Sequence, residues 1–486
     1  MPLYYLYLVG WLEKEGFASE ILDLKPNYLI ATARWLNTEK IIERIIYEVK
    51  NMSPLCIGLC SFVTDYSEQM KLASLLKKAY KDIPIIVGNA QASFRPQDFI
   101  YSGSPIDYAV IGEGEITLTE LLGYLKYKNK NREEILGIAY LNRNQFHQTG
   151  KRPLIQDLSA LPYPLPYHKL NMRYYLTPNT GTSGMLRSQA EIIAGRGCPF
   201  KCEFCAANVV WKQNSNYKPV RLMPTGRIVD EIIYLKKTYN IDSFFIIDDT
   251  FTIKKTYVID FCNELIKRKI NLIWEFQSRV NLIDEELIRL LKKARCIQIH
   301  FGVESGSQKI LDRVRKEIKM EDTIKVFDMC KDYKIRTTAN IIVNLPEENE
   351  EDIKLTEKLL KRIRPAFVNI AITAAYPGTA LQAEFFPNMK KEDYPLLSSF
   401  EGRMDKFKMC NHNLDLIEVV RRLRKYSQAS SILPFNNKQF IKSFIRSKHK
   451  LEYISIYLLH LLQILFLSTE YIFKKMVISG KARKFW

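Results

Sequence analysis

Two series of alternating strand and helix signals, separated by a proline-rich segment, constrain the fold of this 486-residue chain more than any other feature. The first series spans 1–125 and the second begins at 191. Short apolar runs that alternate with amphipathic stretches are typical of parallel sheets whose strands are joined by helices. Because the chain is also longer than one ordinary domain, the sequence predicts at least two α/β units.

The first series predicts a doubly wound, flavodoxin-like parallel sheet over 1–125. Its expected strands lie at 20–24, 55–60, 83–88 and 108–112, and its expected helices at 3–15, 37–50, 66–80, 96–102 and from 116. In such a sheet the first strand is central, yet this sequence starts directly on the first helix. Either the true start lies upstream, or the sheet lacks its middle strand.

The second series predicts a partial (β/α)6 barrel over 191–385. Its strands are expected at 191–195, 243–248, 272–278, 297–303, 336–343 and 367–373, with helices at 224–238, 255–268, 283–294, 321–332 and 349–362. Residues 126–190 read as a β-hairpin at 137–148 and an extended connector at Leu161–Tyr167, which three prolines keep from being helical. The remainder, 386–486, reads as a helical, basic C-terminal region. In barrels of this kind chemistry collects at the C-terminal ends of the strands.

The composition restricts the class of protein to which this chain can belong. A hydrophobic share of 47% excludes wholesale disorder, and nine cysteines in so long a chain exclude a disulfide scaffold. The net charge of +19 favours an anionic partner, although a basic proteome would produce it too. The apolar N-terminus lacks a basic leader and a cleavage site, so it reads as a core helix of a cytoplasmic protein and not as a signal peptide.

Three cysteines follow the first barrel strand with C-x3-C-x2-C spacing: Cys198, Cys202 and Cys205. Three thiolates satisfy three irons of a 4Fe–4S cube and leave the fourth iron open. A structural zinc site needs a fourth nearby ligand, and the nearest histidines in the sequence are His168 and His300. The spacing therefore favours an iron–sulfur cluster, with zinc as the alternative.

This loop resembles the cysteine loop of the radical S-adenosylmethionine (SAM) superfamily, with Phe204 in the aromatic position before the last cysteine. The resemblance covers roughly 190–385. It implies that SAM chelates the open iron and is cleaved to a 5′-deoxyadenosyl radical. It also implies an electron donor such as flavodoxin or ferredoxin.

The same resemblance implies a set of SAM-binding residues at successive strand ends: Phe204, Asp248, Asp249, Arg279, Glu304 and Ser305. Asp249 would also suit a helix N-cap, which leaves its role open. Arg279 is expected to pair with the SAM carboxylate. Tyr376–Thr379 matches a family turn as well. The fifth-strand segment Asn344–Asn349 departs from the family pattern, which puts its SAM contacts in doubt.

Residues 1–125 resemble the cobalamin-binding domain fused to one large radical SAM subgroup. The resemblance implies a cobalamin site that includes Ser61, Thr64, Gly88, Gly112, Glu113, Gly114 and Glu115. The acids of the Gly-Glu-Gly-Glu turn would equally suit the N-terminus of a helix. No histidine precedes His147, so any bound cobalamin is expected without a histidine ligand. Asn89 replaces the usual second glycine after Gly88, which puts cobalamin retention in question.

The last 49 residues, 438–486, carry ten Lys or Arg and two Glu. Between the basic blocks lies an apolar stretch at 451–473 with its polar residues on one helical face. This pattern predicts an interfacial helix and peripheral membrane contact at the inner face of the membrane. A helix docked on the barrel is the alternative.

The favoured function is cobalamin-dependent radical C-methylation of an unactivated carbon on a hydrophobic small molecule: a lipid, isoprenoid or tetrapyrrole. Related two-domain proteins form rings instead, as in anaerobic magnesium-porphyrin ester cyclisation. A tRNA methylthiotransferase would explain the charge, but it needs three more N-terminal cysteines where only Cys56 and Cys60 exist. A zinc-holding nucleic-acid binder is the non-enzymatic alternative, and a nucleic-acid partner is not expected. The sequence names no catalytic residue.

Overall fold

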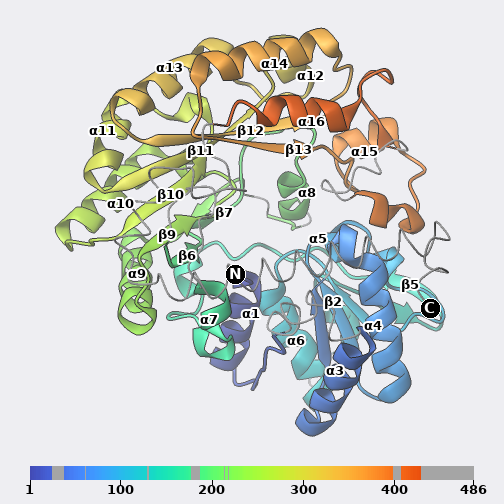
Figure 1. Ribbon diagram of the computed structural model, residues 1–486. Helices are drawn as coiled ribbons and strands as arrows, with labels where there is room; N and C mark the ends of the chain where they lie inside the picture. The colour runs from blue at the N-terminus through green and yellow to red at the C-terminus, as the bar shows by residue number, and fades with distance from the viewer. Residues whose placement is uncertain are drawn as a thin grey trace, which may run out of the picture.

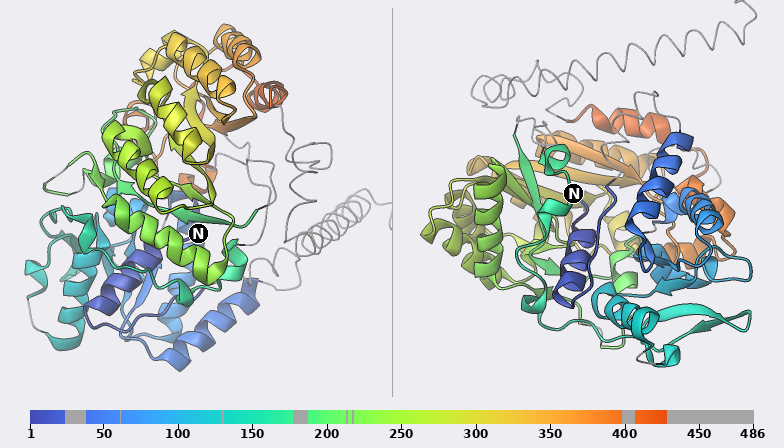
Figure 2. Two further views of the ribbon diagram at one scale, coloured as in Figure 1. Left: turned by 90° about the vertical axis from the view of Figure 1, so that its left-hand side faces the viewer. Right: turned by 90° about the horizontal axis from the view of Figure 1, so that it is seen from below.

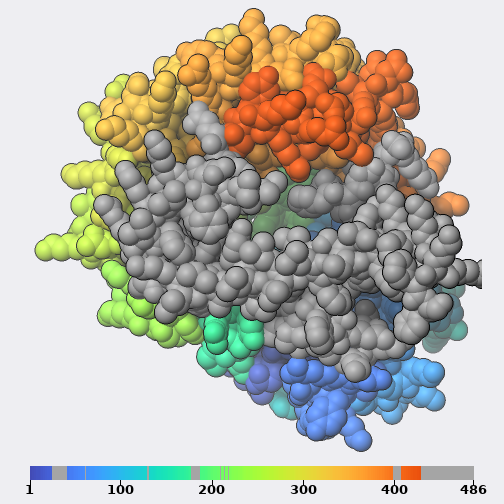
Figure 3. Space-filling view, in the orientation of Figure 1, coloured from blue at the N-terminus to red at the C-terminus, as the bar shows by residue number. Residues whose placement is uncertain are grey.

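The computed structural model describes residues 1–23, 38–60, 62–128, 131–176, 187–212, 214–216, 218–397 and 407–427. Within them an N-terminal five-stranded sheet with a parallel core and a curled six-stranded parallel sheet form the two halves of the molecule (Figure 1). Both were predicted, and this α/β fold class is confirmed. In the space-filling view the barrel's later helices and the N-terminal domain lie at opposite ends (Figure 3).

The N-terminal sheet has the order β1-β2-β3-β4-β5. Three parallel strands, β1 (Ile57–Cys60), β2 (Ile85–Gly88) and β3 (Tyr108–Val110), are followed by an antiparallel hairpin of β4 (Ile138–Asn142) and β5 (Gln145–Gln148). The hairpin that the sequence suggested as part of a connector therefore extends this sheet. Helices flank the sheet on both faces: α1 (Leu3–Lys14) and α6 (Gly114–Tyr127), and α3 (Thr38–Met52) and α4 (Tyr66–Ala79) (Figure 1).

Two expected elements of this half differ. Residues 20–23 are not in a strand, and residue 24 lies outside the described residues. In place of a helix at 96–102 there is a short helix α5 (Ala90–Phe94) and a 3-10 turn at Pro96–Asp98. Pro96 is the cause, because it holds Arg95 out of the helical region and ends α5.

The curled sheet has the order β6-β9-β10-β11-β12-β13, all parallel. The strands are β6 (Gln189–Ile192), β9 (Ser243–Ile246), β10 (Ile273–Ser278), β11 (Cys296–Glu304), β12 (Arg336–Val343) and β13 (Phe367–Ile372). Helices cover its convex face: α9 (Thr225–Tyr239), α10 (Lys255–Lys267), α11 (Glu285–Lys293), α12 (Gln308–Arg313), α13 (Met320–Asp332) and α14 (Glu350–Ile363) (Figure 2). The predicted partial barrel is confirmed.

The aromatic core of the barrel lies between this sheet and its helices. Trp274 of β10 stacks on Phe244 of β9 with ring centroids 5.6 Å apart, and Phe261 of α10 meets both rings edge-on. The side chains that alternate with these residues point to the concave face, which leaves that face free for polar groups such as Glu275 and His300.

The first barrel strand is split, a feature that the sequence did not reveal. β6 ends at Ile192, and the chain re-forms a two-residue strand, β7 (Gly195–Arg196), that pairs antiparallel with β8 (Arg221–Leu222). This small ribbon immediately precedes the cysteine loop and a short helix, α8 (Ala207–Trp211).

After the barrel the chain returns to the N-terminal domain. Following α15 (Ala380–Phe385), the 3-10 segment Lys391–Leu397 packs there, and the Tyr394 hydroxyl donates to Asp98 Oδ2 at 2.6 Å. Helix α16 (Leu416–Arg424) then packs beside β13. Among the described residues no helix is both long and apolar enough to cross a bilayer. The predicted interfacial helix at 451–473 lies outside those residues.

Candidate active site

The three cysteines lie on one loop at the C-terminal end of the barrel. All three are half-buried, and the Cys205 amide donates to the Cys202 carbonyl at 3.1 Å. The Cys198 sulfur is 3.5 Å from Thr250 Oγ1, just beyond β9, and the Cys202 sulfur accepts from Arg279 Nη1, just beyond β10, at 3.4 Å. The ends of two barrel strands therefore contact two of the thiols directly.

The donor set of this loop fits a 4Fe–4S cluster. Burial raises the pKa of Cys205 to about 11, and the neighbouring Cys202 and Cys198 add to the effect. A thiolate at Cys205 therefore needs a compensating positive charge, which iron supplies. Among the described residues, no group of three His, Cys, Asp or Glu side chains is arranged to hold a single ion; a cube binds each thiolate through a different iron.

Arg279 packs against the cysteine loop. Its guanidinium lies 3.6 Å from the centroid of the Phe200 ring and donates to the backbone carbonyls of Lys316 and Glu317 as well as to the Cys202 sulfur. The sequence predicted Arg279 as the partner of the SAM carboxylate. In the structure, it joins the loop to the segment after α12.

Glu304 forms a buried ion pair that the sequence did not reveal. Its Oε1 is 2.5 Å from Nζ of Lys316, and both residues are nearly inaccessible to solvent. The ammonium lies 5.9 Å from the ring centroid of Phe204, which places the pair beside the last cysteine. An added Cβ on Gly302 would lie 2.5 Å from Glu304 Oε1 and 2.7 Å from Lys316 Nζ, so a larger residue there would displace the ion pair. Lys316 belongs to a charged run that reads as solvent-exposed, which is why it was missed.

Ser305, by contrast, faces away from this pair. Its hydroxyl accepts from the Ser307 amide at 3.2 Å and lies 3.5 Å from the Thr356 hydroxyl on α14. The predicted SAM residues Phe204, Arg279 and Glu304 are thus brought together at the cysteine loop, and Ser305 is not.

Asp248 and Asp249, which follow β9, hold the backbone that leads into the cysteine loop. Asp248 Oδ1 accepts from the Ala194 amide at 2.7 Å, and burial raises the pKa of this carboxyl to about 7. Asp249 Oδ2 accepts from the indole Nε1 of Trp211 at 3.2 Å. Both residues also line the cavity between the two halves of the molecule.

This cavity has a volume of about 1270 Å³ and draws its walls from both domains. The N-terminal domain contributes the strand ends predicted for cobalamin: Gly88, Gly112, Glu113, Gly114 and Glu115. The barrel contributes Gly195, Arg196, Trp211, Ile247, Asp248 and Asp249. The volume exceeds that of a typical pocket for a drug-sized ligand, as a corrin requires. Most of the lining is apolar, including residues of α1, α3 and the edge strand β1.

The remaining cobalamin candidates contribute less to this cavity. Thr64 donates to the neighbouring Asp65 carboxylate at 3.2 Å and is not among the lining residues. Ser61 lies outside the described residues. Asn89 stands where the family pattern has a second glycine. It adopts a φ of +80°, a backbone conformation that glycine adopts readily, and its side chain donates to the Cys60 sulfur at 2.9 Å.

The two acids of the Gly-Glu-Gly-Glu turn bind arginines of the barrel. Arg196 donates to Glu113 Oε1 and to Glu115 Oε1, both at 2.7 Å, and Arg221 donates to both oxygens of Glu113 at 2.9 Å. Burial would raise the pKa of Glu115, but Arg196 more than offsets it, so the pKa falls below its ordinary value. Gly112, at a φ of +77°, abuts Asn214, whose side-chain oxygen would lie 2.7 Å from an added Cβ.

Comparison with known proteins finds a separate family match for each half of the molecule. Residues 192–360 match the radical SAM superfamily model, and residues 2–122 match the B12 binding domain model. An uncharacterized methyltransferase of Pyrococcus horikoshii is 26% identical over 73% of this chain and 76% of its own. The anaerobic magnesium-protoporphyrin IX monomethyl ester cyclase of Rubrivivax gelatinosus is 26% identical over 93% of this chain and 77% of its own.

A solved structure shows the same fold. The radical SAM methyltransferase TsrM from Kitasatospora setae, with tryptophan and a SAM analogue bound, superposes with a TM-score of 0.65 at 18% identity, covering 79% of this chain and 72% of TsrM. The cofactors expected from the sequence, a 4Fe–4S cluster, SAM and cobalamin, are those of the two domains present. The chain therefore combines a radical SAM domain with a B12-binding domain and is an enzyme.

Proposed function

We propose that this enzyme forms a carbon–carbon bond by cobalamin-dependent radical chemistry, with C-methylation of an unactivated carbon as the leading reaction. The observation that carries the proposal is the cavity of about 1270 Å³ between the strand ends of the N-terminal sheet and those of the barrel. It lies next to the cysteine loop, because Gly195 and Arg196 line it and Cys198 follows two residues later. When bound, the cluster and SAM supply an organic radical, and cobalamin supplies a carrier for a methyl group.

Several residues of this chain have roles in the proposal. Cys198, Cys202 and Cys205 hold the cluster, and Arg279 donates a hydrogen bond to one of its thiolates. The Glu304–Lys316 pair offers a carboxylate and an ammonium, the two groups that complement the amino and carboxylate ends of SAM. The apolar lining excludes water, which protects a radical from side reactions.

The experiment is anaerobic reconstitution with iron, sulfide and hydroxocobalamin, followed by assay of products derived from SAM. We expect close to four irons per chain and both 5′-deoxyadenosine and S-adenosylhomocysteine. Cys202→Ala should lose the cluster and 5′-deoxyadenosine formation, while Cys330→Ala, which alters a buried thiol on α13, should keep both. Zinc as the only metal, with an unaffected Cys202→Ala protein, would refute the radical SAM assignment of this loop.

Ring formation is the second candidate, and the similarity to a magnesium-protoporphyrin ester cyclase over 93% of this chain favours it. The two reactions differ in their products. Methylation from SAM through cobalt releases S-adenosylhomocysteine as well as 5′-deoxyadenosine. A cyclase that uses only the radical releases 5′-deoxyadenosine alone, so the ratio of the two products separates these candidates.

A hydrophobic substrate and peripheral membrane contact through 438–486 are also part of the proposal, together with flavodoxin or ferredoxin as reductant. The support for the membrane contact and the hydrophobic substrate is the sequence of the tail, where each basic residue near an anionic bilayer contributes roughly 1 kcal/mol. Full-length protein should sediment with anionic liposomes at low salt, and deletion of 438–486 should abolish this. If the full-length protein ignores such liposomes, the membrane contact is absent and the hydrophobic substrate loses its support.

A further inference from the structure

Four buried side chains form a charge-balanced unit across the boundary between the two domains. Glu113 and Glu115 come from the turn into α6, Arg196 from β7 and Arg221 from β8. Their four closest ion-pair contacts are 2.7 to 2.9 Å long, and the exposed fractions of the four side chains are 12% or less. Two arginines and two glutamates leave no net charge, as a buried ionic cluster requires.

The β7–β8 ribbon brings the two arginines together. In its two-residue ladder Arg196 lies opposite Arg221, so two like charges share one face of the ribbon. Their repulsion is offset by the Glu113 carboxylate, which reaches both guanidiniums, and by Glu115, which pairs with Arg196. The ribbon therefore depends on the N-terminal domain for its counter-charge.

Arg196 is rigidly connected to the cysteine loop. Gly197, the one residue between Arg196 and Cys198, has a φ of +96°, and a Cβ there would lie 2.3 Å from the Pro219 carbonyl oxygen. On the other side Asp248 fixes the Ala194 amide. The backbone from 194 to 198 therefore has little freedom to move independently of Arg196.

Three of the four residues also belong to the cobalamin side. Glu113, Glu115 and Arg196 line the cavity between the domains, and the two acids open helix α6. Glu113 is further anchored by the Ile155 amide, which donates to its Oε2 at 2.8 Å. Ion pairs therefore connect the cavity wall at this turn directly to Arg196. A displacement of the turn would move Arg196 and, with it, the loop that carries Cys198.

We propose that Glu113, Glu115, Arg196 and Arg221 form a positioning unit that couples the cobalamin site to the cluster site. The inference rests on the proposed function, because it requires both cofactors. Coupling between two binding sites is reciprocal. A cluster held by Cys198 should therefore change the affinity for cobalamin, and bound cobalamin should change the environment of the cluster.

The test measures cobalamin affinity of the full-length protein by absorbance titration with hydroxocobalamin, with and without a reconstituted cluster. Coupled sites typically change each other's affinity by about 5- to 150-fold, and we expect a change of at least about 5-fold in the wild type. Arg196→Gln should bring the ratio of the two affinities close to one, and Arg196→Lys should restore part of it. The electron paramagnetic resonance spectrum of the reduced cluster should shift on cobalamin binding in the wild type but not in Arg196→Gln.

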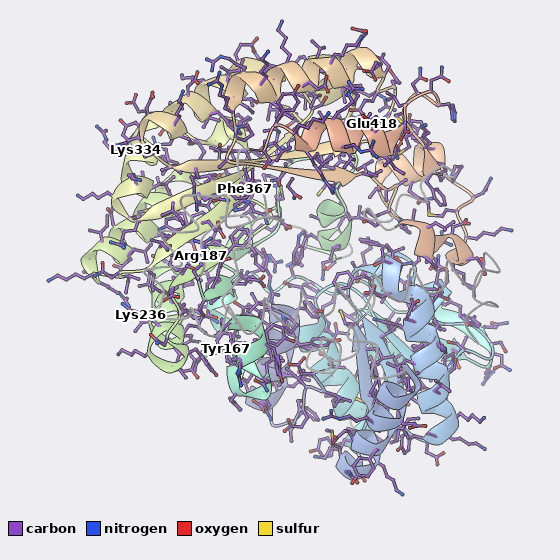
Figure 4. All side chains as sticks on the ribbon, viewed as in Figure 1. Tyr167, Arg187, Lys236, Lys334, Phe367 and Glu418 are labelled. Carbon is purple, nitrogen blue, oxygen red and sulfur yellow. The ribbon has the colours of Figure 1, made fainter. Side chains whose placement is uncertain are left out.

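Arg187→Gln is the matched control. Arg187 lies in the barrel (Figure 4) and donates to the buried carboxylate of Glu275 at 2.7 Å, so its loss breaks an equally buried pair that does not reach the other domain. This variant should keep the wild-type ratio. If Arg196→Gln does not fold, Glu115→Gln is the second variant. It removes one charge of the same unit with little change in shape and should bring the ratio of the two affinities closer to one.

The two possible failures can be told apart. A wild type that takes up both cofactors but shows equal affinities, or an Arg196→Gln protein that keeps the wild-type ratio, overturns the coupling alone. A wild type that takes up no cobalamin or no cluster overturns the proposed function, and the coupling with it.

Discussion

Gly197 has the most restrictive surroundings of the glycines near the cysteine loop. Its positive φ excludes most side chains, and the Pro219 carbonyl fills the space where a Cβ would lie. Gly103, in a surface turn of the N-terminal domain, has a similar φ of +83°, but no atom lies within 4 Å of its Cβ position. The two glycines therefore separate the cost of an unfavourable φ from the cost of a steric clash.

We expect Gly197→Ala to lower the free energy of unfolding by about 3 kcal/mol and Gly103→Ala by about 1 kcal/mol. Gly197→Ala should also lower the iron content after reconstitution, because the clash displaces the residue next to Cys198. Chemical denaturation and iron analysis of both variants check this. Equal losses in the two variants would mean that Pro219 yields and the loop is not confined.

Single residues were also where the sequence was least informative. The three cysteines predicted as cluster ligands could be proposed from their spacing, because all three lie within eight residues of the chain. Glu113 and Glu115 fit a helix N-terminus and a cofactor site equally well, since a sequence does not show which arginine will face a carboxylate. The same limit hid Lys316, whose pairing partner Glu304 is on another element.

Among the structural elements, the turn between β12 and α14 holds a buried carboxyl group with a raised pKa. The Glu348 side chain accepts from the Asn344 amide at 2.9 Å and the Leu345 amide at 3.3 Å, and burial raises its pKa to about 8. Asn344 in turn donates to the Thr373 and Phe407 carbonyls. The departure from the family pattern at Asn344–Asn349 therefore coincides with a buried connection to the segment after the barrel.

A raised carboxyl pKa gives Glu348 a predictable effect on stability. The unfolded chain ionises this group near pH 4.3 and the folded chain near pH 8, so the folded state binds the extra proton between these values. The stability that this proton contributes is complete below pH 4.3 and is lost as pH rises to 8. Glu348→Gln cannot ionise, so its free energy of unfolding should rise relative to wild type between pH 5 and 8. Urea denaturation across this range measures the difference, and parallel pH curves would contradict the raised pKa.

Most elements could be predicted because their periodicity is strong. All six barrel strands and their five long connecting helices lie within a few residues of the expected positions. The failures have local causes: Pro96 ends a helix early, and the first strand is split where Gly195 packs tightly against β8 and Gly197 against Pro219. Close approach between distant segments leaves no periodic signal in a sequence.

For the whole molecule, the contacts between the domains suggest one cooperative unit. Besides the ion-paired unit, Tyr394 after the barrel contacts the N-terminal domain through Asp98 and through the Tyr66 ring, whose centroid is 5.5 Å away. An added Cβ on Gly10 of α1 would lie 2.9 Å from Pro162, so the connector packs closely there as well. Removal of 1–125 would expose all of these surfaces.

We therefore expect hydrogen exchange of β2 and β12 to be limited by the same global unfolding. Cobalamin at 100 times its Kd should stabilise both by about 2.7 kcal/mol, although only one belongs to the B12-binding domain. Exchange mass spectrometry of peptides from both strands checks this. Protection confined to β2 would show that the domains unfold independently.

The β7–β8 ribbon also decides where chains of this kind can be recombined. A hybrid cut at the domain border near 125 takes Glu113 and Glu115 from one parent and Arg196 and Arg221 from the other. If the first parent lacks either acid, two arginines are enclosed without their full counter-charge, and the hybrid should fail although each half is sound. A crossover after 222, inside the barrel, keeps all four residues from one parent. The position at which segments of two such proteins can be joined, after 222, therefore differs from the position at which the domains divide, near 125.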